Sequence, residues 1–532
     1  MELFVESSWL FYGLLSSIPL LYWYFTRNFN YWKSLGINGP KPIVGFGTLL
    51  YQFLTPKPYL ELEWYKKYGK LYGILNGSNP ALTIAEPELI KHVLVKDFNS
   101  FADRTRKRRI HPILKHHLIE SSGDDWKRLR SIITPTFTSG KMKKMYPMIA
   151  DCLNDFVNAL DVYARDKQEV NIKDMYGNFT MDVIATCAFA TKTNTHKDPN
   201  NPFMVNTLKI FNPKLYRILP AIVLPNFVQK ALGFFGFDES ANDFFFNITR
   251  HIIKQRQQSG TGSKHNDFIQ LLLNIQNNNN NSHNNHNKLK EDNDNNEAHY
   301  VNEGEEELAV EKRLLTETDK YITEEEILAN AWIFFQAGYE TTASTLTFCT
   351  YELALNPDIQ ERLYDEVMTS VNNSSGNIDY DLLAKLPFLD AVISETLRIH
   401  SPVLRLGRAC LKDYKLADTG ITIKKGQAVE IPVYAIHHSE EYYERPSEFI
   451  PDRFLPENRH KIIPYTYLPF GVGPRNCIGM RFALMEAKLG LAQIVKRFRF
   501  TRNRQTDVPF NLKKSPILLS PKRVVVTIER RN

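Results

Sequence analysis

The sequence predicts a mainly α-helical protein with small β-sheets (α+β), in which one long helix crosses a large domain behind an N-terminal transmembrane helix. The clearest evidence is a capping box at Thr323–Glu326, where a hydroxyl and a carboxylate can satisfy the first free N–H groups of a helix. That helix can run to Leu355, because a proline follows closely, and at about 1.5 Å per residue it would be roughly 50 Å long. Shorter patterns indicate helices at residues 59–69, 391–398 and 480–489 and strands at residues 70–75 and 81–84.

The composition is that of a large globular protein in a reducing compartment. The 532 residues are 43% hydrophobic, and the net charge of +7 comes from scattered basic residues, so nucleic-acid binding is not expected. The five cysteines form an odd, widely spaced set without zinc-site spacing, which argues against a disulfide framework or a structural zinc. They are Cys152, Cys187, Cys349, Cys410 and Cys477.

The segment Trp9–Phe25 is almost wholly apolar and, at about 1.5 Å per residue, reaches roughly 25 Å, close to the thickness of a thin bilayer. Tyr and Trp gather at its C-terminal end, and Arg27 and Lys33 follow it. Because basic residues mark the cytosolic side of such segments, a single-pass anchor with the body of the chain in the cytosol is predicted. A cleaved signal peptide is the alternative, which the acidic start disfavours.

The predicted organisation is an anchor at residues 1–28, a proline-containing linker at 29–50 and a large domain at 51–532. Within that domain an Asn-rich, low-complexity stretch at about 276–307 has too little apolar surface to order itself, so we expect a disordered surface insert. The apolar, aromatic segment 203–237 fits two interpretations equally: ordinary core, or a hydrophobic lid over a substrate channel that dips into the membrane.

The most informative stretch is Phe470–Gly479, which places Cys477 in a tight loop directly before a helical pattern. Glycines in such a loop let backbone N–H groups point at the sulfur, which lowers the thiol pKa and suits a thiolate metal ligand. For the other four cysteines a buried, inert thiol is the expected state.

Five motifs, taken together and in this order, resemble the cytochrome P-450 superfamily of haem-thiolate monooxygenases. The Cys loop matches the family pattern at every fixed position, and the resemblance covers the chain from about Gly39 to its end. Local runs around the motifs look most like the microsomal 3A-type clan, although the Asn-rich insert departs from it. The motifs are the WxxxR helix (Trp126, Arg130), the AGxET helix (Ala337–Thr341), the ExxR pair (Glu395, Arg398), the PxRF run (Pro451–Phe454) and the Cys loop (Phe470, Gly473, Arg475, Cys477, Gly479).

The resemblance implies the cytochrome P-450 fold, haem b as cofactor and Cys477 as the axial ligand to its iron. Thiolate ligation pushes electron density onto iron and favours O–O cleavage. Phe470 would pack beside the sulfur, with Gly473 and Gly479 shaping the loop. The haem propionates would be held by guanidinium forks and an indole N–H, with the candidates Arg104, Trp126, Arg130, Arg408 and Arg475.

The resemblance also assigns two groups of polar residues. Thr341 and Glu340 match the family's acid–alcohol pair, which delivers protons to iron-bound oxygen; the alternative is a helix-interior threonine that bonds a backbone carbonyl. Glu395, Arg398 and Arg453 are assigned to a buried structural ion network, in which removing one partner costs about 3–5 kcal/mol.

Substrate contacts are predicted from position along the motifs and are largely apolar, which favours a lipophilic substrate such as a sterol, a fatty acid or a xenobiotic. A basic run around Arg106 leaves a preference for acidic lipids open. The predicted contacts are Ile333, Phe334, Ala337, Val403, Leu404, Arg405 and Ile517.

Electrons must come from a partner, because the sequence has no flavin or nicotinamide fingerprint. The resemblance implies NADPH–cytochrome P-450 reductase, with cytochrome b5 as a second candidate, and a place in the endoplasmic reticulum membrane among its lipids. The candidate docking residues are Lys127, Arg128 and Lys488, for which ordinary solvated charges are an equal alternative. Two other functions stay open: a haem-thiolate isomerase or dehydratase acting on a lipid peroxide, and a non-catalytic haem sensor.

Overall fold

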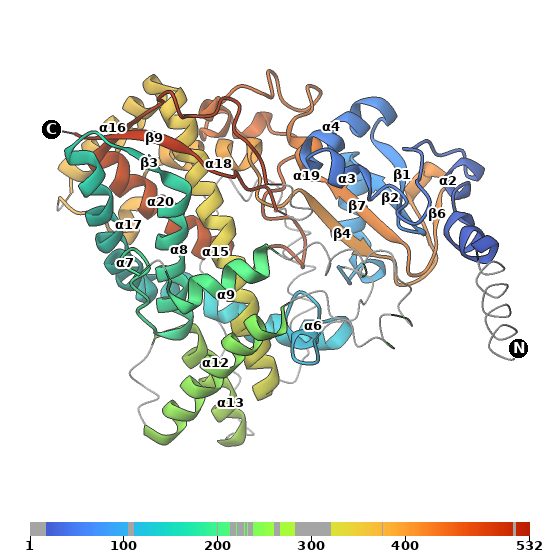
Figure 1. Cartoon of the computed structure of the whole chain (residues 1–532), viewed down its shortest axis with the longest axis horizontal. Coiled ribbons are helices and arrows are strands. Elements are labelled where there is room, and N and C mark those ends of the chain that lie inside the picture. The colour runs from blue at the N-terminus through green and yellow to red at the C-terminus, as the bar shows by residue number, and fades with distance from the viewer. Residues whose placement is uncertain are drawn as a thin grey trace, which may run out of the picture.

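The computed structural model describes residues 18–104, 111–198, 200–212, 238–259, 266–281, 321–374, 376–513 and 518–531, together with residues 220, 228 and 231. Helices dominate one side of the molecule, and a small sheet with short helices forms the other side (Figure 1). The prediction of a mainly α-helical protein with small sheets is confirmed. The longer helices are α4 (Lys57–Tyr68), α6 (Gly123–Ile133), α7 (Ser139–Arg165), α8 (Ile172–Phe189), α9 (Pro202–Phe211), α12 (Glu239–Ser259), α13 (Phe268–Asn281), α15 (Glu324–Leu355), α16 (Pro357–Asn372), α18 (Pro387–Ile399) and α20 (Met480–Arg497).

Short elements connect these helices. The short α-helices are α2 (Tyr31–Ser34), α3 (Tyr51–Leu54), α5 (Pro87–Lys91), α17 (Tyr380–Leu383) and α19 (Val433–His437), and a π-helix, η1 (His92–Lys96), follows α5 directly. The single-turn 3-10 helices are η2 (Phe98–Ser100), η3 (Leu114–His116), η4 (Thr134–Phe137), η6 (Ala417–Thr419), η7 (Pro451–Phe454) and η8 (Arg459–Lys461).

Three small sheets complete the fold. The largest has the strand order β1-β2-β7-β4, with β7 parallel to β2 and antiparallel to β4. A second has the order β3-β9-β8, and β5 pairs with β6. The two strands predicted from sequence are β1 and β2, which pair as an antiparallel hairpin. The strands are β1 (Leu71–Asn76), β2 (Asn79–Ile84), β3 (Glu169–Asn171), β4 (Arg405–Ala409), β5 (Tyr414–Lys415), β6 (Thr422–Ile423), β7 (Ala428–Pro432), β8 (Phe498–Thr501) and β9 (Val525–Arg530).

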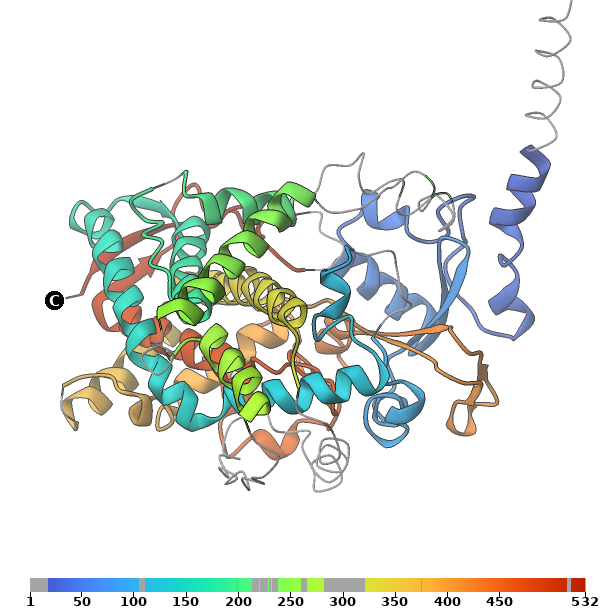
Figure 2. The same ribbon diagram turned by 90° about the horizontal axis from the view of Figure 1, so that it is seen from below.

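The long helix α15 forms where the capping box predicts it. The Glu326 N–H donates to Thr323 Oγ1 at 3.2 Å, and the Thr323 N–H donates to Glu326 Oε2 at 2.9 Å, so both partners satisfy a free donor. The helix ends at Leu355 before Pro357, which cannot continue it. It runs through the molecule beside α8 (Figures 1 and 2). Most of its residues are buried.

The N-terminal predictions fall mostly outside the described residues. The first described segment, residues 18–26, is helical and stands at the edge of the body beside the small sheet (Figure 2). None of the helices in the described part of the chain is both long and apolar enough to cross a membrane. The predicted anchor at residues 1–28 therefore stays a prediction.

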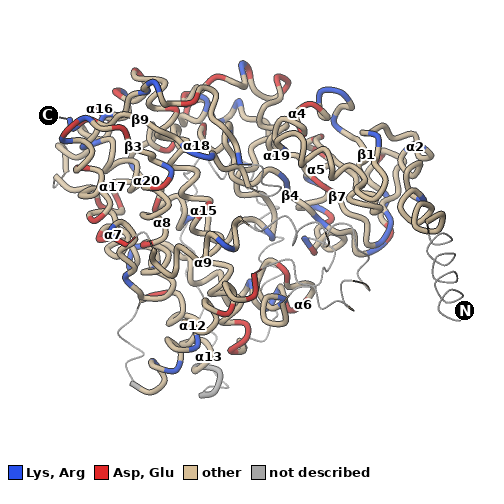
Figure 3. Tube along the Cα trace, viewed as in Figure 1, with Lys and Arg blue, Asp and Glu red and all other residues tan. Residues whose placement is uncertain are grey.

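Two other predicted segments are only partly described. Residues 276–281, expected to begin the insert, instead extend α13, while the rest of the Asn-rich stretch lies outside the described residues. The beginning of the apolar segment 203–237 forms α9, in which Phe203, Thr207 and Ile210 are buried. Lys, Arg, Asp and Glu are interspersed over the described elements (Figure 3).

Candidate functional site

Two glycines and a backbone hydrogen bond give the loop that carries Cys477 its conformation. Gly471 and Gly473 have φ of +71° and +72°, a region that glycine enters without strain. A Cβ on Gly473 would lie 2.1 Å from the carbonyl oxygen of Leu94, in the π-helix η1. The Cys477 N–H donates to the Phe470 carbonyl at 2.9 Å. Glycine at position 473 is therefore required for the loop to close against η1.

Cys477 lies two residues before Gly479, the N-cap of the 18-residue helix α20, and the dipole of a helix favours a negative charge near its N-terminus. Burial raises the pKa of the thiol, while the Gly479 N–H and the guanidinium groups of Arg104 and Arg130 act to lower it. The described residues thus place one backbone N–H donor and two guanidinium cations near the Cys477 sulfur.

Four arginines gather around this loop. Arg130, on α6, donates to the Asn476 carbonyl at 3.1 Å and to Asn476 Oδ1 at 2.5 Å. Arg104 donates to the Arg475 carbonyl at 2.8 Å. Arg408 lies on β4, next to Ala409, whose N–H donates to the Asp103 carbonyl at 2.8 Å and so brings Arg104 and Arg408 together.

Arg475 completes the cluster and contacts Trp126. Its guanidinium lies 4.6 Å from the Trp126 ring, which is 1% exposed, and it donates to the carbonyls of Ile119 and Ser121. The closest carboxylate, Asp103 Oδ1, is 4.0 Å from Arg475 Nη2, at the outer limit of an ion pair. Burial, together with Arg104, lowers the pKa of Arg475 to about 9.

The cluster has more positive charge than its protein partners balance. Arg408 is 3% exposed, donates only to the Gly407 carbonyl, and has no acidic partner among the described residues. Its Nε and that of Arg475 are buried without a hydrogen-bond partner there. Burial and the neighbouring Arg104 and Arg475 lower the pKa of Arg408 far below its usual value. Buried cations of this kind require an anion, so the cluster fits the two propionates of a haem beside Cys477.

One face of α15 is open in the middle of an otherwise buried helix. Ala337 is exposed, and Ile333, Phe334, Gly338 and Thr341 are half-buried, at spacings of three and four that place them on one stripe. The Thr341 hydroxyl donates to the Ala337 carbonyl at 2.6 Å. The stripe therefore offers a small, mostly apolar surface with a single hydroxyl.

Phe137 connects the open stripe with the Cys loop. Its ring lies 5.7 Å from that of Phe334, and its edge would lie 3.9 Å from a Cβ on Gly479. Ile478 packs against the same apolar cluster as Ile333 and Phe334. Gly338 lies at the edge of the stripe that packs against α8, because a Cβ there would meet Ile184 at 2.9 Å. The glycine of the AGxET motif thus permits helix packing, while Ala337 faces the open side.

Glu340 and Thr341 point in different directions. The Glu340 carboxylate, 6% exposed, pairs with Lys173 of α8 at 3.0 Å and accepts from Ser520 Oγ at 2.6 Å. Burial acts to raise its pKa, but Lys173 and Ser520 outweigh burial and hold it below its usual value. The sequence placed the acid beside the hydroxyl, whereas the structure pairs the acid with a lysine.

The other predicted substrate contacts are Val403, Leu404, Arg405 and Ile517. Val403 is half-buried and forms a β-bridge with Leu518. Leu404 is fully buried in a small core with Phe348 and Leu519.

Arg405 makes ion pairs with two other parts of the chain. The Arg405 guanidinium is buried between the carboxylates of Glu61 and Glu430, to which it donates hydrogen bonds. This arrangement uses the side chain for joining α4 to the sheet rather than for contacting a substrate. Ile517 lies outside the described residues, as does the basic run around Arg106.

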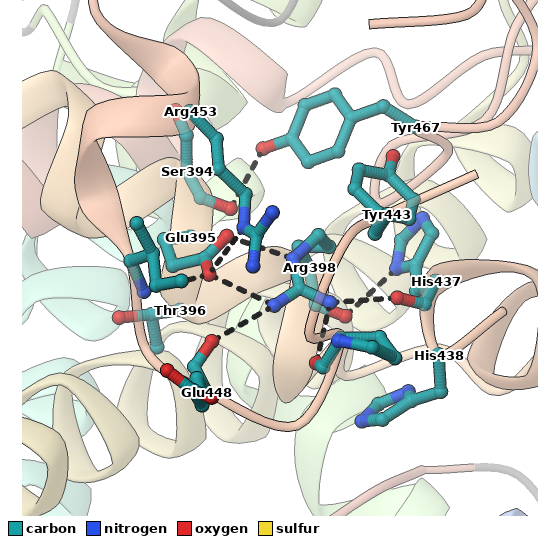
Figure 4. A network of polar contacts seen from close by, with 12 residues as sticks. Ser394, Glu395, Thr396, Arg398, His437, His438, Tyr443, Glu448, Arg453 and Tyr467 are labelled. Carbon is teal, nitrogen blue, oxygen red and sulfur yellow. Dashed lines mark hydrogen bonds and ion pairs between the residues drawn. The ribbon is translucent and has the colours of Figure 1, made fainter. Parts of the chain in front are cut away.

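Glu395, Arg398 and Arg453 form the network that the sequence predicts (Figure 4). Arg398 Nε and Nη2 donate to the two carboxylate oxygens of Glu395 at 2.7 and 2.8 Å, and neither side chain is exposed. Arg453 Nε donates to the same carboxylate at 3.2 Å. Arg398 also donates to the carbonyls of His437, Pro446 and Glu448. One guanidinium therefore ties α18 to the irregular segment before the Cys loop.

Two of the three candidate docking residues are buried in ion pairs. Arg128 pairs with Glu326, and Lys488 pairs with Asp390 at 3.1 Å, with 8% and 5% of their side chains exposed. Lys127 remains partly exposed and pairs with Asp124 at 3.1 Å. Since a docking cation must reach a partner's carboxylates, only Lys127 stays available for that role.

Sequence reasoning missed Lys173, Ser520 and His437. Lys173 is a lone lysine at the beginning of a mostly apolar helix, a pattern that could have indicated a buried partner. Nothing in the sequence pairs Ser520 with Glu340, 180 residues away. His437 hydrogen-bonds two backbone segments, and its sequence neighbours carry no motif.

Comparison with known proteins identifies the class to which this fold and site belong. The family described as Cytochrome P450 matches residues 37–299 and 303–528, so the chain belongs to the cytochrome P450 family: it is a haem-thiolate monooxygenase whose cofactor is haem b. Within that family it is 3A-like. It is 36% identical over 524 residues to cytochrome P450 3A11 of Mus musculus, covering 97% of this chain and 95% of that protein. It is 35% identical over 522 residues to cytochrome P450 3A7 of Homo sapiens, with the same coverage.

Proposed function

We propose that this chain is a membrane-anchored monooxygenase that inserts one oxygen atom from O2 into a lipophilic substrate, with electrons from an NADPH–cytochrome P450 reductase. The observation that carries the proposal is the pairing of two features around Phe137. One is the Cys477 loop with its unbalanced arginine cluster, and the other is the open apolar stripe of α15 with its single hydroxyl.

Each part of the site has a separate task. Bound haem would supply the binding and activation of O2, and the Cys477 thiolate would hold its iron and donate electron density to it. Trp126, Arg130, Arg408 and Arg475, with Arg104, would hold its propionates. Ile333, Phe334 and Ala337 would exclude water and hold an apolar substrate against the stripe.

Thr341 and Glu340 would act in sequence rather than side by side. The Thr341 hydroxyl donates to the Ala337 carbonyl. The lone pairs of the hydroxyl oxygen can therefore accept a hydrogen bond from a water molecule. Glu340 is charged and in contact with the Lys173 ammonium. We infer that water connects this ion pair to Thr341, so that the pair supplies protons and Thr341 places them.

Replacing Thr341 by Ala is expected to reduce the product formed per NADPH oxidised by roughly tenfold or more, since a positioned proton donor contributes about 10²- to 10⁴-fold. Thr341→Ser should retain most of the coupling. The control is Thr347→Ala, because Thr347 makes the same bond to a backbone carbonyl, at 2.6 Å, but is fully buried. Unchanged coupling in Thr341→Ala would contradict the role.

The membrane anchor is proposed for residues 1–28, which places the domain on the cytosolic side of the endoplasmic reticulum membrane. Trp9–Phe25 has the apolar length and the aromatic C-terminal end of a membrane-spanning segment. The resemblance to the microsomal 3A-type clan indicates the endoplasmic reticulum as the membrane. Cytochrome b5 is a second proposed electron donor.

Deleting residues 1–28 is expected to move most of the protein from the alkaline-washed membrane pellet to the soluble fraction, because about 20 apolar residues hold a single-pass protein in a bilayer. Replacing residues 1–28 by an unrelated apolar helix should restore the membrane fraction and serves as the control. If the deletion variant stays in the membrane pellet to the same extent as the full chain, another segment anchors the protein in the membrane.

Oxygen consumption tests the reaction type. The purified chain with reductase and NADPH should consume O2 only in the presence of a substrate, chosen by spectral binding among sterols, fatty acids and xenobiotics. Rearrangement of a lipid peroxide without NADPH would instead favour an isomerase, and haem spectra without any turnover would favour a sensor. The Thr341 hydroxyl on the open stripe favours the monooxygenase.

A further inference from the structure

His437 occupies a position between the ion network and the segment that leads into the Cys loop. It is the last residue of α19 and its side chain is fully buried. Its carbonyl accepts from Arg398 Nη1 at 2.7 Å, and its ring lies 2.9 Å from the Arg398 carbonyl through Nδ1 (Figure 4). Backbone and side chain of one residue are thus both bound to Arg398.

The other ring nitrogen of His437 reaches toward the Cys loop. The Leu468 N–H donates to Nε2 at 2.9 Å, so Nε2 is an acceptor and Nδ1 must carry the proton that bonds the Arg398 carbonyl. Burial, together with Arg398, lowers the pKa of His437 well below its usual value. The ring is therefore neutral in a single tautomer, and a protonated ring could not accept from Leu468.

From Leu468 the contacts continue into the loop. The Gly471 N–H donates to the Leu468 carbonyl at 3.1 Å, and the Cys477 N–H donates to the Phe470 carbonyl at 2.9 Å. The adjacent Tyr467 packs against the His437 ring, with centroids 5.8 Å apart, and its hydroxyl donates to the Ser394 carbonyl of α18 at 3.2 Å. The segment before the loop is thus tied to α18 directly through Tyr467 and indirectly, through His437, at Leu468.

We propose that His437 is a positioning residue that transmits the fixed geometry of the Glu395–Arg398 pair to the Cys477 loop through the hydrogen bond from the Leu468 N–H. The inference rests on the proposed ligation of haem iron by Cys477. Loss of the bond leaves a buried N–H without a partner, which loosens Leu468 and with it the loop. The sulfur then loses its fixed position, and the protonated thiol competes with the thiolate as ligand.

His438 provides a matched control. It is the next residue, and burial with Arg398 nearby lowers its pKa to about 3. Its ring stacks on that of Tyr434 with centroids 3.9 Å apart, and its Nδ1 contacts the carbonyl of Tyr434, in the preceding helix α19, at 2.9 Å. It therefore resembles His437 in its lowered pKa, although it is half-buried, and among the described residues no hydrogen bond connects its ring to the segment before the loop.

The test compares four variants of the full-length holoprotein: His437→Phe, His437→Gln, His437→Asn and His438→Phe. The readouts are the ratio of thiolate- to thiol-ligated haem in the reduced carbonyl spectrum, and the rate of haem transfer to an excess of haem-scavenging protein. His437→Phe keeps a ring against Tyr467 but removes both hydrogen bonds. We expect it to lower the ratio and to speed haem loss, each by about tenfold, which is the effect of one buried hydrogen bond.

The two amide variants separate positioning from packing. The amide of Gln reaches the place of Nε2 and can accept from Leu468, whereas that of Asn reaches only the place of Nδ1 and can bond the Arg398 carbonyl. His437→Gln should therefore restore the spectral ratio to within about threefold of wild type, and His437→Asn should resemble His437→Phe. His438→Phe should match wild type.

Three results would overturn the inference: a wild-type ratio in His437→Phe, equal ratios in the Gln and Asn variants, or the same loss in His438→Phe. The proposed ligation is tested apart from these variants. If Cys477→Ser keeps the thiolate spectrum, the assignment of the ligand is wrong, whatever the His437 variants show.

Discussion

Cys477→Ser is expected to abolish the thiolate-ligated carbonyl spectrum and to reduce monooxygenase activity to background, while the apoprotein stays folded. A serine hydroxyl is close in size to a thiol but stays protonated at neutral pH, so it cannot supply the electron density that a thiolate donates to iron. The loop should survive, because Gly471, Gly473 and the bond from the Cys477 N–H to the Phe470 carbonyl hold it through the backbone. Reduced carbonyl spectra, NADPH oxidation and circular dichroism measure the three parts of this expectation.

Cys410→Ser is the control for Cys477→Ser. Cys410 is buried, and its thiol donates to the Lys412 carbonyl at 2.8 Å, a bond that a serine hydroxyl can replace. Its spectrum and activity should therefore stay close to wild type. A thiolate spectrum that persists in Cys477→Ser but disappears in Cys410→Ser would move the ligand to Cys410.

Arg398→Met is expected to prevent stable haem incorporation by lowering the free energy of unfolding by about 3–5 kcal/mol. The substitution strands the Glu395 carboxylate, which is fully buried, and leaves three backbone carbonyls without their guanidinium donor. Since a folded domain is stable by only about 5–15 kcal/mol, such a loss makes the segment before the Cys loop marginal. Urea unfolding of the apoprotein and haem content after expression measure the two effects.

Substitutions of two further arginines should destabilise the protein less than Arg398→Met does. Arg453 makes one 3.2 Å bond to Glu395 and keeps 14% of its side chain exposed, so Arg453→Met should cost less than Arg398→Met. Arg362 pairs with Asp452 at the surface, and half of its side chain is exposed. Arg362→Met should therefore lower the free energy of unfolding by only about 0–1 kcal/mol. Equal losses in all three variants would show that burial of the network does not determine its contribution.

The predictions that the structure confirms concern residues whose partners lie close to them in the sequence. The capping box of α15 was predictable because Thr323 and Glu326 are three residues apart and satisfy each other locally. Strands β1 and β2 were predictable because a short turn joins them. By contrast, Arg405 was predicted as a substrate contact, and its buried partner Glu61 lies 344 residues away. No local pattern contains that information.

The sequence by itself determined the Cys477 loop, the order of the five motifs and hence the family and the reaction class, because glycine conformations and helix caps are short-range properties. Only the tertiary structure decided which partner each buried charged or polar side chain has. It paired Glu340 with Lys173, buried Lys488 against Asp390, and placed His437 between Arg398 and Leu468. A buried charge or ring nitrogen must find a partner within about 3 Å, and that partner is set by helices and strands that meet only when the whole chain has folded.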